Sequence, residues 1–150
     1  MISNHVDIGV YFDAISQGER FSVTVLGFNP HLDVAILKIL DEFKDWKAFS
    51  IGDERRNKPL IDHPNHYELG YLTHKEVLKF LNKSEIAVVP SRWEEPFGRT
   101  SLEATSRGCA TIISNRGGLP ETTNSAIILK KINSNELYLE IKKLITNNKK

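Results

Sequence analysis

The chain has 150 residues, of which 40% are hydrophobic and 26% are charged, and its formal net charge is +1. This balance is ordinary for one soluble globular domain with a sizeable core. The small net charge argues against a nucleic-acid-binding protein, which usually carries a basic excess. The single cysteine, Cys109, excludes an internal disulfide framework and fits a reducing compartment.

The termini and the hydropathy favour a cytoplasmic protein. Residues 1–7 lack the basic start and the apolar run of a signal peptide. No apolar stretch approaches the ~20 residues of a transmembrane segment. Lys149 and Lys150 would suit contact with an anionic membrane surface, which would make the protein peripheral to a membrane, but we expect a solvated tail there.

Residues 1–20 show no clean periodicity and are left unassigned, whereas patterns of strand and helix alternate along residues 21–150. Apolar runs predict strands at 21–26 and 46–51, each stopped by a glycine. Between these strands, apolar residues recur at the spacing of an amphipathic helix: Leu32, Ile36, Ile39, Leu40 and Phe43. A polar, proline-bearing loop is expected next, followed by a short strand at 66–69.

The second half of the chain continues the alternation. Thr73 and Glu76 have the spacing of a capping box, which opens a helix whose inward side chains are Val77, Leu78 and Leu81. The remaining predicted elements are strands at 86–90, 109–113 and 126–129 and helices at 99–107 and 137–145, with a loop and a short helix starting in 116–121. Several strands are apolar on both faces, which indicates a parallel sheet between helices. The predicted fold class is therefore α/β, with a Rossmann-like parallel sheet in a single domain.

The segment 93–103, Trp-Glu-Glu-Pro-Phe-Gly-Arg-Thr-Ser-Leu-Glu, carries most of the functional information. It follows the buried strand at 86–90 as a loop with Pro96 and Gly98, and a helix opens at about Arg99. The carboxyl end of a strand, a glycine loop and a helix N-terminus together form the place where α/β sheets bind phosphorylated ligands.

Two carboxylates flank this predicted phosphate cradle, Glu95 in the loop and Glu103 in the helix. A helix rises ~1.5 Å per residue, so Glu103 lies only ~6 Å along the axis from Arg99, and both glutamates can line one cleft. A carboxylate repels phosphate, but it accepts hydrogen bonds from sugar hydroxyls. Two such acceptors suit a ligand with hydroxyls at both ends and a diphosphate between them, and a nucleotide sugar is such a molecule.

Glu95 and Glu103, separated by seven residues, resemble the signature of retaining glycosyltransferases of family 4 (glycosyl transferase group 1), which have two Rossmann-like halves in the GT-B fold. The resemblance runs from roughly Trp46 to Leu144. It includes four stretches: Phe49-Ser50-Ile51-Gly52-Asp53, Leu69-Gly70-Tyr71-Leu72, Pro90-Ser91-Arg92-Trp93-Glu94-Glu95-Pro96-Phe97-Gly98 and Gly117-Gly118-Leu119-Pro120-Glu121. In this family the matched domain is the C-terminal half, which binds the donor.

The resemblance implies a role for each matched position. Glu95 would hold hydroxyls of the transferred sugar and is the candidate catalytic residue. The backbone of Phe97 and Gly98 would approach the sugar and the diphosphate, and amides around Thr100 would bind a phosphate. Glu103 would hold the ribose hydroxyls.

Further donor contacts are expected beside these residues. Gly70 and Tyr71 would lie near the nucleobase by the same resemblance. Arg99 is unfavourably placed for the helix dipole, which makes it a candidate for a phosphate contact, with plain solvent exposure as the alternative. Retention in this family is usually explained by front-face attack, so that donor positioning and charge stabilisation do most of the catalysis. The acceptor stays unknown.

No metal and no cofactor is expected besides the nucleotide sugar, which is the substrate. The chain lacks the Asp-x-Asp pair through which the other major glycosyltransferase fold binds a metal–diphosphate. His63 and His66, with Asp62, have no convergent fourth ligand, so we interpret them as surface residues. Cys109 begins a buried strand and is interpreted as a core residue.

Two departures from the family bear on catalysis. The family places an Arg and a Lys after the first strand, against the donor diphosphate, but no Lys or Arg occurs between Arg20 and Lys38. Losing one such stabiliser of developing charge costs about 10²–10³ in rate. The acceptor-binding N-terminal half has no counterpart within these 150 residues. We therefore expect a separate N-terminal half as a partner, and weak catalysis without it.

Other interpretations of the same residues stay open. A non-catalytic or truncated nucleotide-sugar-binding module is the alternative to an enzyme, and the missing Arg and Lys favour it. A nicotinamide-dependent dehydrogenase is disfavoured, because residues 27–32 do not supply Gly-x-Gly-x-x-Gly after the first strand. Glu103 could instead complete a capping box with Thr100, and Trp93 could pack over the loop instead of stacking on a sugar.

Overall fold

The computed structural model describes residues 22–26, 30–52 and 61–147. The unassigned N-terminal segment and the Lys149-Lys150 end lie outside these residues. Most of the predicted polar loop also lies outside them, as does the stretch 27–29 that follows the first strand.

Six parallel strands form one sheet in the order β3-β2-β1-β4-β5-β6. The strands are β1 (Ser22–Leu26), β2 (Lys47–Ile51), β3 (His66–Gly70), β4 (Ile86–Val89), β5 (Ala110–Ser114) and β6 (Ile127–Leu129). This strand order has its topological switch point between β1 and β4. The predicted fold class, an α/β Rossmann-like parallel sheet, is confirmed.

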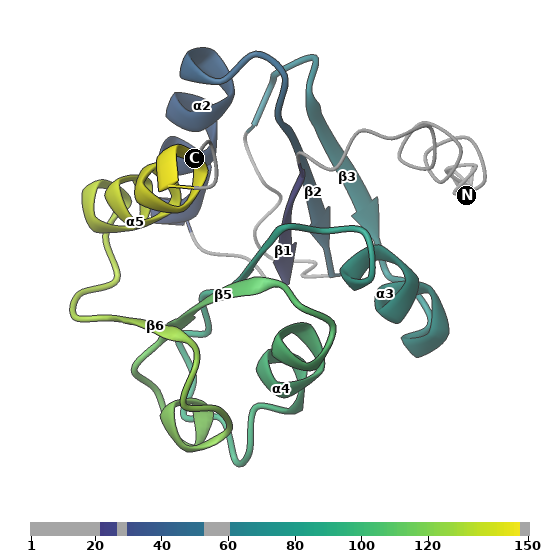
Figure 1. Ribbon diagram of the computed structural model, residues 1–150, viewed down its shortest axis with the longest axis vertical. Coiled ribbons are helices and arrows are strands. Elements are labelled where there is room, and N and C mark those ends of the chain that lie inside the picture. Colours follow the sequence, from purple (N-terminus) through teal and green to yellow (C-terminus); the bar gives the residue numbers. More distant parts are fainter. Residues whose placement is uncertain (1–21, 27–29, 53–60, 148–150) are drawn as a thin grey trace.

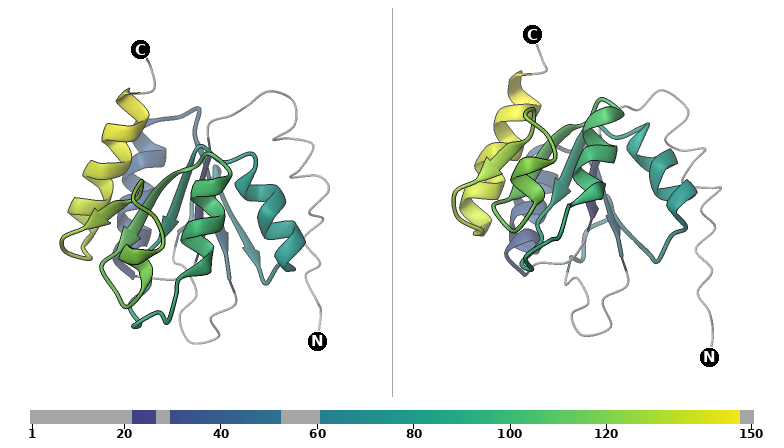
Figure 2. Two further views of the ribbon diagram at one scale, coloured as in Figure 1. Left: turned by 60° about the horizontal axis from the view of Figure 1, so that its bottom comes forward. Right: turned by 90° about the horizontal axis from the view of Figure 1, so that it is seen from below.

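Helices cover both faces of the sheet (Figures 1 and 2). They are α2 (Pro30–Glu42), α3 (His74–Leu81), α4 (Arg99–Ser106), the short 3₁₀-helix η1 (Leu119–Glu121) and α5 (Ser134–Asn147). Helices α2 and α5 lie side by side on one face, and α3 and α4 lie on the other. Each predicted helix and strand is found, with ends that differ by a few residues.

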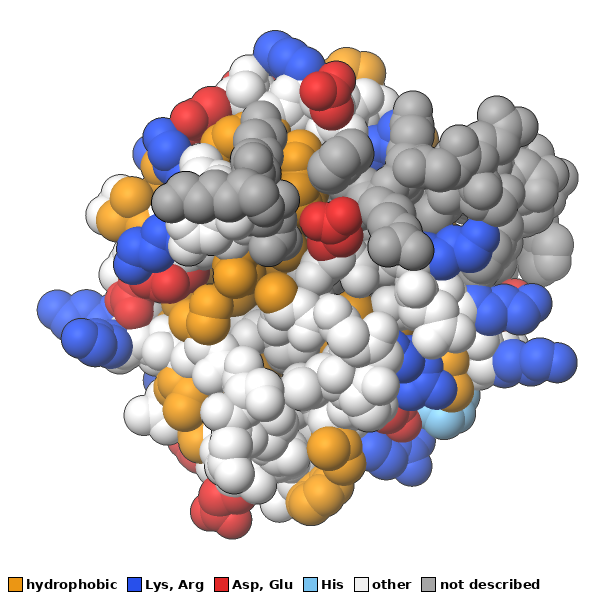
Figure 3. Space-filling model, in the orientation of Figure 1, with side chains coloured by type: hydrophobic (Ala, Val, Ile, Leu, Met, Phe, Trp, Pro, Cys, Tyr) orange, Lys and Arg blue, Asp and Glu red, His pale blue; other side chains and the backbone are white. Residues whose placement is uncertain are grey.

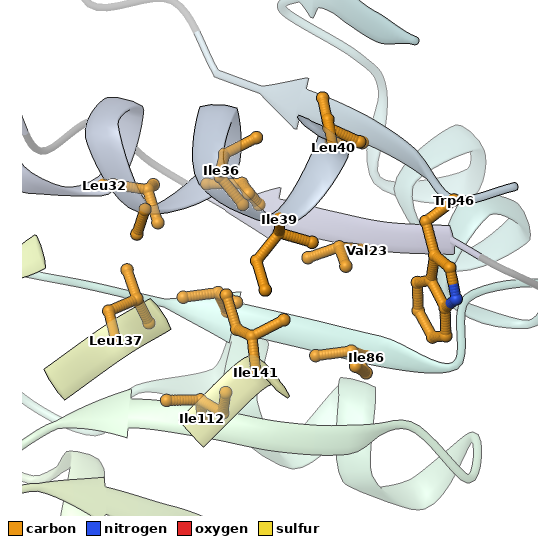
Figure 4. Packing of buried hydrophobic residues seen from close by; sticks show 14 of the residues in the cluster. Val23, Leu32, Ile36, Ile39, Leu40, Trp46, Ile86, Ile112, Leu137 and Ile141 are labelled. Atoms are coloured by element: carbon orange, nitrogen blue, oxygen red, sulfur yellow. The ribbon is translucent and has the colours of Figure 1, made fainter. Parts of the chain in front are cut away.

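The first of these faces holds the largest core (Figure 4). Successive side chains of a strand point to opposite faces of the sheet. Accordingly, Ile86 and Val88 of β4 pack with α2 and α5, whereas Ala87 packs with α3 and α4. Four of the apolar residues predicted to form the inner face of the first helix are buried in this core: Leu32, Ile36, Ile39 and Leu40. The fifth, Phe43, follows the end of α2 and is partly buried against the same core.

On the opposite face, α3 is fixed both by its cap and by an aromatic contact. The predicted capping box forms, with Thr73 and Glu76 bonded reciprocally. Phe80 is fully buried, and its ring centroid lies 5.6 Å from that of Phe49. Val77, predicted to face inward, is half-buried and packs against the clusters that contain Phe80 and Leu81. These contacts bring the start of α3 next to α4.

On the face that Figure 3 shows, apolar side chains are scattered among polar and charged ones. Lys and Arg side chains gather at the edge over α3, whose sequence contains Lys75 and Lys79. Among the described helices, none is both long and apolar enough to cross a lipid bilayer.

Candidate functional site

The loop 90–98 connects β4 to α4 at the topological switch point of the sheet. Strands β1 and β4 are neighbours, but β1 leads to α2 on one face and β4 leads to α4 on the other. In open parallel sheets, ligands bind in the crevice that this divergence creates outside the carboxyl ends of the strands. Glu95, Phe97 and Gly98 all lie in this loop.

Gly98 is the N-cap residue of α4 and has φ 75° and ψ 47°, a left-handed conformation that favours glycine. A Cβ atom on Gly98 would lie 2.5 Å from Cδ2 of Leu119. The cap makes no side-chain hydrogen bond, and Arg99 and Thr100 begin the helix. The first N–H groups of a helix have no intrahelical partner, and their partial positive charge favours a phosphate. The alternative capping box between Thr100 and Glu103 is wrong, because the helix begins before Thr100.

The loop that follows β5 is fastened to the loop that precedes α4. Glu94 Oε2 accepts a hydrogen bond from the backbone N–H of Gly117 at 2.6 Å, and Glu94 Oε1 accepts one from Nη1 of Arg116 at 3.3 Å. The backbone N–H of Gly118 donates to the carbonyl oxygen of Glu95 at 2.7 Å. The two loops therefore form one unit around Glu95.

The close approach of these loops requires glycine. Gly117 has φ +51°, and a Cβ atom there would lie 2.3 Å from the carbonyl oxygen of Glu95. A Cβ atom on Gly118 would lie 2.7 Å from the carbonyl oxygen of Pro96. The Gly117-Gly118 pair thus serves the packing of the site loops as well as the turn before η1.

The half-buried carboxylate of Glu95 has a defined orientation. Ser91 Oγ donates to Glu95 Oε1 at 2.7 Å, and Ser114 Oγ in turn donates to the carbonyl oxygen of Ser91. A carboxylate has about four acceptor positions, so the bond from Ser91 leaves capacity for hydroxyl donors of a ligand.

The Glu103 side chain extends from α4 toward the start of α3. Its carboxylate contacts one side chain from each helix, His74 of α3 and Arg99 of α4. His74 Nε2 lies 2.8 Å from Glu103 Oε1, and Arg99 Nε lies 3.2 Å from the same oxygen. The Glu103 side chain is 18% exposed, whereas that of Arg99 is 72% exposed. Arg99 is thus exposed, as one of the two expectations has it, but it is also paired with Glu103; its contact with a phosphate stays a prediction.

Three aromatic side chains stand exposed where strands end. Tyr71 follows β3, whereas Trp93 and Phe97 follow β4, and they are 78%, 73% and 57% exposed, respectively. Gly70 ends β3 with φ +65°, and nothing lies within 4 Å of its hypothetical Cβ atom. The preference for glycine here therefore comes from the backbone turn before Tyr71 and not from close packing. Trp93 does not pack over the loop, contrary to one of the two interpretations from sequence.

His63 and His66 are half-buried, so the expectation that they are surface residues is wrong, and each has a partner other than a metal. Nε2 of His66 lies 2.8 Å from Ser50 Oγ, and Nε2 of His63 lies 3.5 Å from Asp41 Oδ1. Within the part of the chain that the structure describes, no three His, Cys, Asp or Glu side chains are placed to hold a metal ion. Cys109 is a core residue, as predicted, and burial raises the pKa of its thiol to about 11.

Sequence reasoning missed two residues that contact the predicted site. Glu94 stands in the motif that contains Glu95, and His74 follows the cap residue Thr73, but the sequence predicts no contact for either. Nothing in the local pattern marks either contact, because their partners lie 23 and 29 positions away.

A family model described as "Glycosyl transferases group 1" matches residues 22–150, and the chain belongs to this family. Over 53 residues, 35% of the chain, it is 45% identical to glycogen synthase of Mycobacterium tuberculosis (strain ATCC 25618 / H37Rv). Over 47 residues, 31% of the chain, it is 40% identical to spore coat protein SA of Bacillus subtilis (strain 168). These matches span only 13% and 12% of the two relatives.

Solved structures share the fold over nearly the whole chain. Anabaena Alr3699/HepE in complex with UDP-glucose superposes with a TM-score of 0.73 over 95% of this chain and 44% of that one, at 18% identity. UDP-N-acetylglucosamine 2-epimerase superposes with a TM-score of 0.69 over 92% of this chain and 37% of that one, at 17% identity. Likeness at such low identity shows the fold alone, and an epimerase shares it.

Proposed function

We propose that this chain is the donor-binding half of a retaining GT-B glycosyltransferase of family 4, which transfers a sugar from a nucleotide-diphosphate sugar to an acceptor. Membership of the glycosyl transferase group 1 family supports this proposal. The observation that carries it is the pair of carboxylates, Glu95 before α4 and Glu103 within it, on either side of a helix start capped by Gly98. This arrangement suits the two hydroxyl-bearing ends of a nucleotide sugar.

Each group has a chemical task in this proposal. Glu95, oriented by Ser91, accepts hydrogen bonds from the transferred sugar and is the catalytic residue of this half. The backbone of Phe97 and Gly98 and the first amides of α4, around Thr100, hold the diphosphate.

The remaining groups hold the nucleoside. Glu103 accepts from the ribose hydroxyls, Gly70 and Tyr71 lie beside the base, and Arg99 reaches a phosphate. The diphosphate charge is met by amides and by this guanidinium, so we propose that neither a metal nor a cofactor takes part. We place the reaction in the cytoplasm.

The experiment is a thermal-shift and calorimetry panel with UDP, GDP and ADP and their glucose conjugates. Uridine nucleotides enter the panel because the HepE structures contain UDP-glucose or UDP. We expect a nucleoside diphosphate to raise the melting temperature, since ligand binding to the folded state stabilises it by mass action. Glu103→Ala should abolish that shift.

Glu140→Ala is the matched control for this variant. Glu140 is also a partly buried helical glutamate with a nearby ion pair, to Lys143 at 2.6 Å, but it lies on α5. Its replacement should leave the nucleotide shift unchanged. A wild-type chain that binds none of the nucleotides, or a Glu103→Ala variant that binds them normally, would contradict the proposal.

The alternative function is a non-catalytic nucleotide-sugar module that needs a separate acceptor domain. The absence of Lys and Arg between Arg20 and Lys38 favours it, because two stabilisers of the leaving diphosphate are then missing. Hydrolysis or transfer from a bound nucleotide sugar should be assayed with and without a candidate N-terminal GT-B half. Turnover by the chain alone would eliminate the alternative.

A further inference from the structure

His74 makes a contact that the proposed donor site does not account for. Its Nε2 atom lies 2.8 Å from Glu103 Oε1 and joins the start of α3 to α4 across 29 positions of sequence. An ionised carboxylate can only accept hydrogen bonds, so Nε2 must carry the proton and donate it. The interaction is thus a charge-assisted hydrogen bond of defined direction.

The local structure of α3 holds His74 in place. His74 is the first residue of the helix, directly after Thr73, whose capping box with Glu76 fixes the entry of the chain. Leu72, two residues earlier, is buried in the cluster of Phe80. The His74 side chain is 57% exposed, yet its backbone is anchored on both sides. These contacts therefore fix the position of the backbone that carries the His74 donor.

Both partners of Glu103 contact the same oxygen. His74 and Arg99 lie 2.8 and 3.2 Å from Oε1. Because a carboxylate has two oxygens, this arrangement fixes the plane of the group and leaves the acceptor capacity of Oε2 for a ligand. Arg99 alone, on an exposed and flexible side chain, would hold the carboxylate less well.

We infer that His74 is a positioning residue: it orients the Glu103 carboxylate toward the ribose hydroxyls of the nucleotide and so sets the preference for a ribonucleotide. The inference depends on the proposed function, in which Glu103 binds the ribose. His74 itself need not touch the ligand. Its removal should weaken the binding of the ribose hydroxyls more than that of the diphosphate.

The test compares dissociation constants of UDP, GDP and ADP with those of their 2′,3′-dideoxy counterparts. For the nucleotide that binds, the wild-type ratio of dideoxy to ribonucleotide constants measures the hydroxyl contribution. His74→Ala should reduce this ratio about three- to tenfold, the coupling typical of groups in direct contact. His74→Gln, which retains an amide donor at similar reach, should restore much of it.

His63→Ala is the control, because His63 also lies near a carboxylate, Asp41, but at 3.5 Å and on another element. It should leave the ratio unchanged. A general loss of stability lowers both affinities together and leaves the ratio intact, so an unchanged ratio in His74→Ala would overturn the inference while the proposed function stands. Failure of the wild type to bind any ribonucleotide would overturn both.

A ligand-free measurement tests the contact by itself. Long-range ¹⁵N–¹H spectra of the histidine rings should show the tautomer with the proton on Nε2 for His74, and Glu103→Gln should change the His74 signals. A neutral His74 ring in the wild type with its only proton on Nδ1 would overturn the inference whatever the nucleotide data show.

Discussion

His66 is held in a half-buried position at the start of β3 by Ser50, whose Oγ lies 2.8 Å from Nε2. Burial lowers the pKa of His66, and a hydrogen bond with the backbone at Ile61 opposes this effect only in part. The unfolded chain therefore binds a proton at His66 more readily than the folded chain does. By linkage, the stability that this residue contributes is present above its unfolded pKa of about 6.5 and is lost as the pH falls below it.

We expect His66→Gln to reduce this pH dependence. Glutamine can still hydrogen-bond Ser50 but does not titrate. The free energy of unfolding of the His66→Gln variant should therefore fall less than that of the wild type between pH 7.5 and 5.5. Urea unfolding at both pH values gives the comparison, and carboxylates contribute little in this range. Equal losses in the two proteins would show that protonation of His66 does not oppose folding.

Gly117 has a different constraint, since it needs both a positive φ and room for the neighbouring loop. A Cβ atom there would lie 2.3 Å from the carbonyl oxygen and 2.5 Å from the backbone nitrogen of Glu95. Gly117→Ala must therefore shift the backbone that carries Glu95. We expect it to lower the free energy of unfolding by about 1–3 kcal/mol and to weaken nucleotide-sugar binding.

Gly108→Ala separates these two constraints. Gly108 also has a positive φ, of +84°, but nothing lies within 4 Å of its hypothetical Cβ. Its replacement should cost about 1 kcal/mol of stability from backbone strain alone and leave ligand affinity unchanged. If both variants bind the nucleotide sugar as tightly as the wild type, the contact of Gly117 with Glu95 has no role in the site.

At the scale of the elements, the patterns that depend on burial could be predicted from sequence. The strand β4, Ile86–Val89, is apolar at every position because both of its faces are covered, and this pattern identified it. The capping box of Thr73 identified the start of α3 because it depends only on residues three apart.

Helix ends that depend on hydrogen bonds of polar side chains with the backbone are harder to predict from sequence. Helix α5 begins at Ser134 instead of Leu137, because Asn133 Oδ1 accepts from the backbone N–H of Glu136. The Glu136 carboxylate in turn accepts from the backbone N–H groups of Lys130 and Lys131. These polar bonds add a first turn that the apolar periodicity does not reveal.

The residues of the candidate site likewise fall into those that the sequence predicts and those that it does not. Glu95 and Glu103 could be singled out because they belong to a short motif on one loop and one helix. Glu94 and His74 could not, because their contacts join loops and helices that only the folded sheet brings together. Residues of a local motif can thus be recognised in the sequence, whereas the contacts that orient them depend on tertiary structure.

At the scale of the whole molecule, the sheet separates the candidate site from the main core. The loops after β4 and β5 join α4 and η1 on one face, whereas α2 and α5 seal the large apolar cluster on the other. Stability and ligand binding should therefore respond independently to substitutions on the two faces, provided that the sheet itself stays intact.

Ile141→Ala tests this separation, because Ile141 of α5 is fully buried against α2 and the sheet (Figure 4). Removal of its side chain should lower the free energy of unfolding by about 2–5 kcal/mol through lost burial and an incompletely filled cavity. Leu139→Ala on the same helix, where the side chain is 43% exposed, should cost far less. Calorimetric titration below the melting temperature should give the wild-type nucleotide affinity for both variants, whereas a weakened affinity only in Ile141→Ala would show that the core of α2 and α5 is coupled to the site through the sheet.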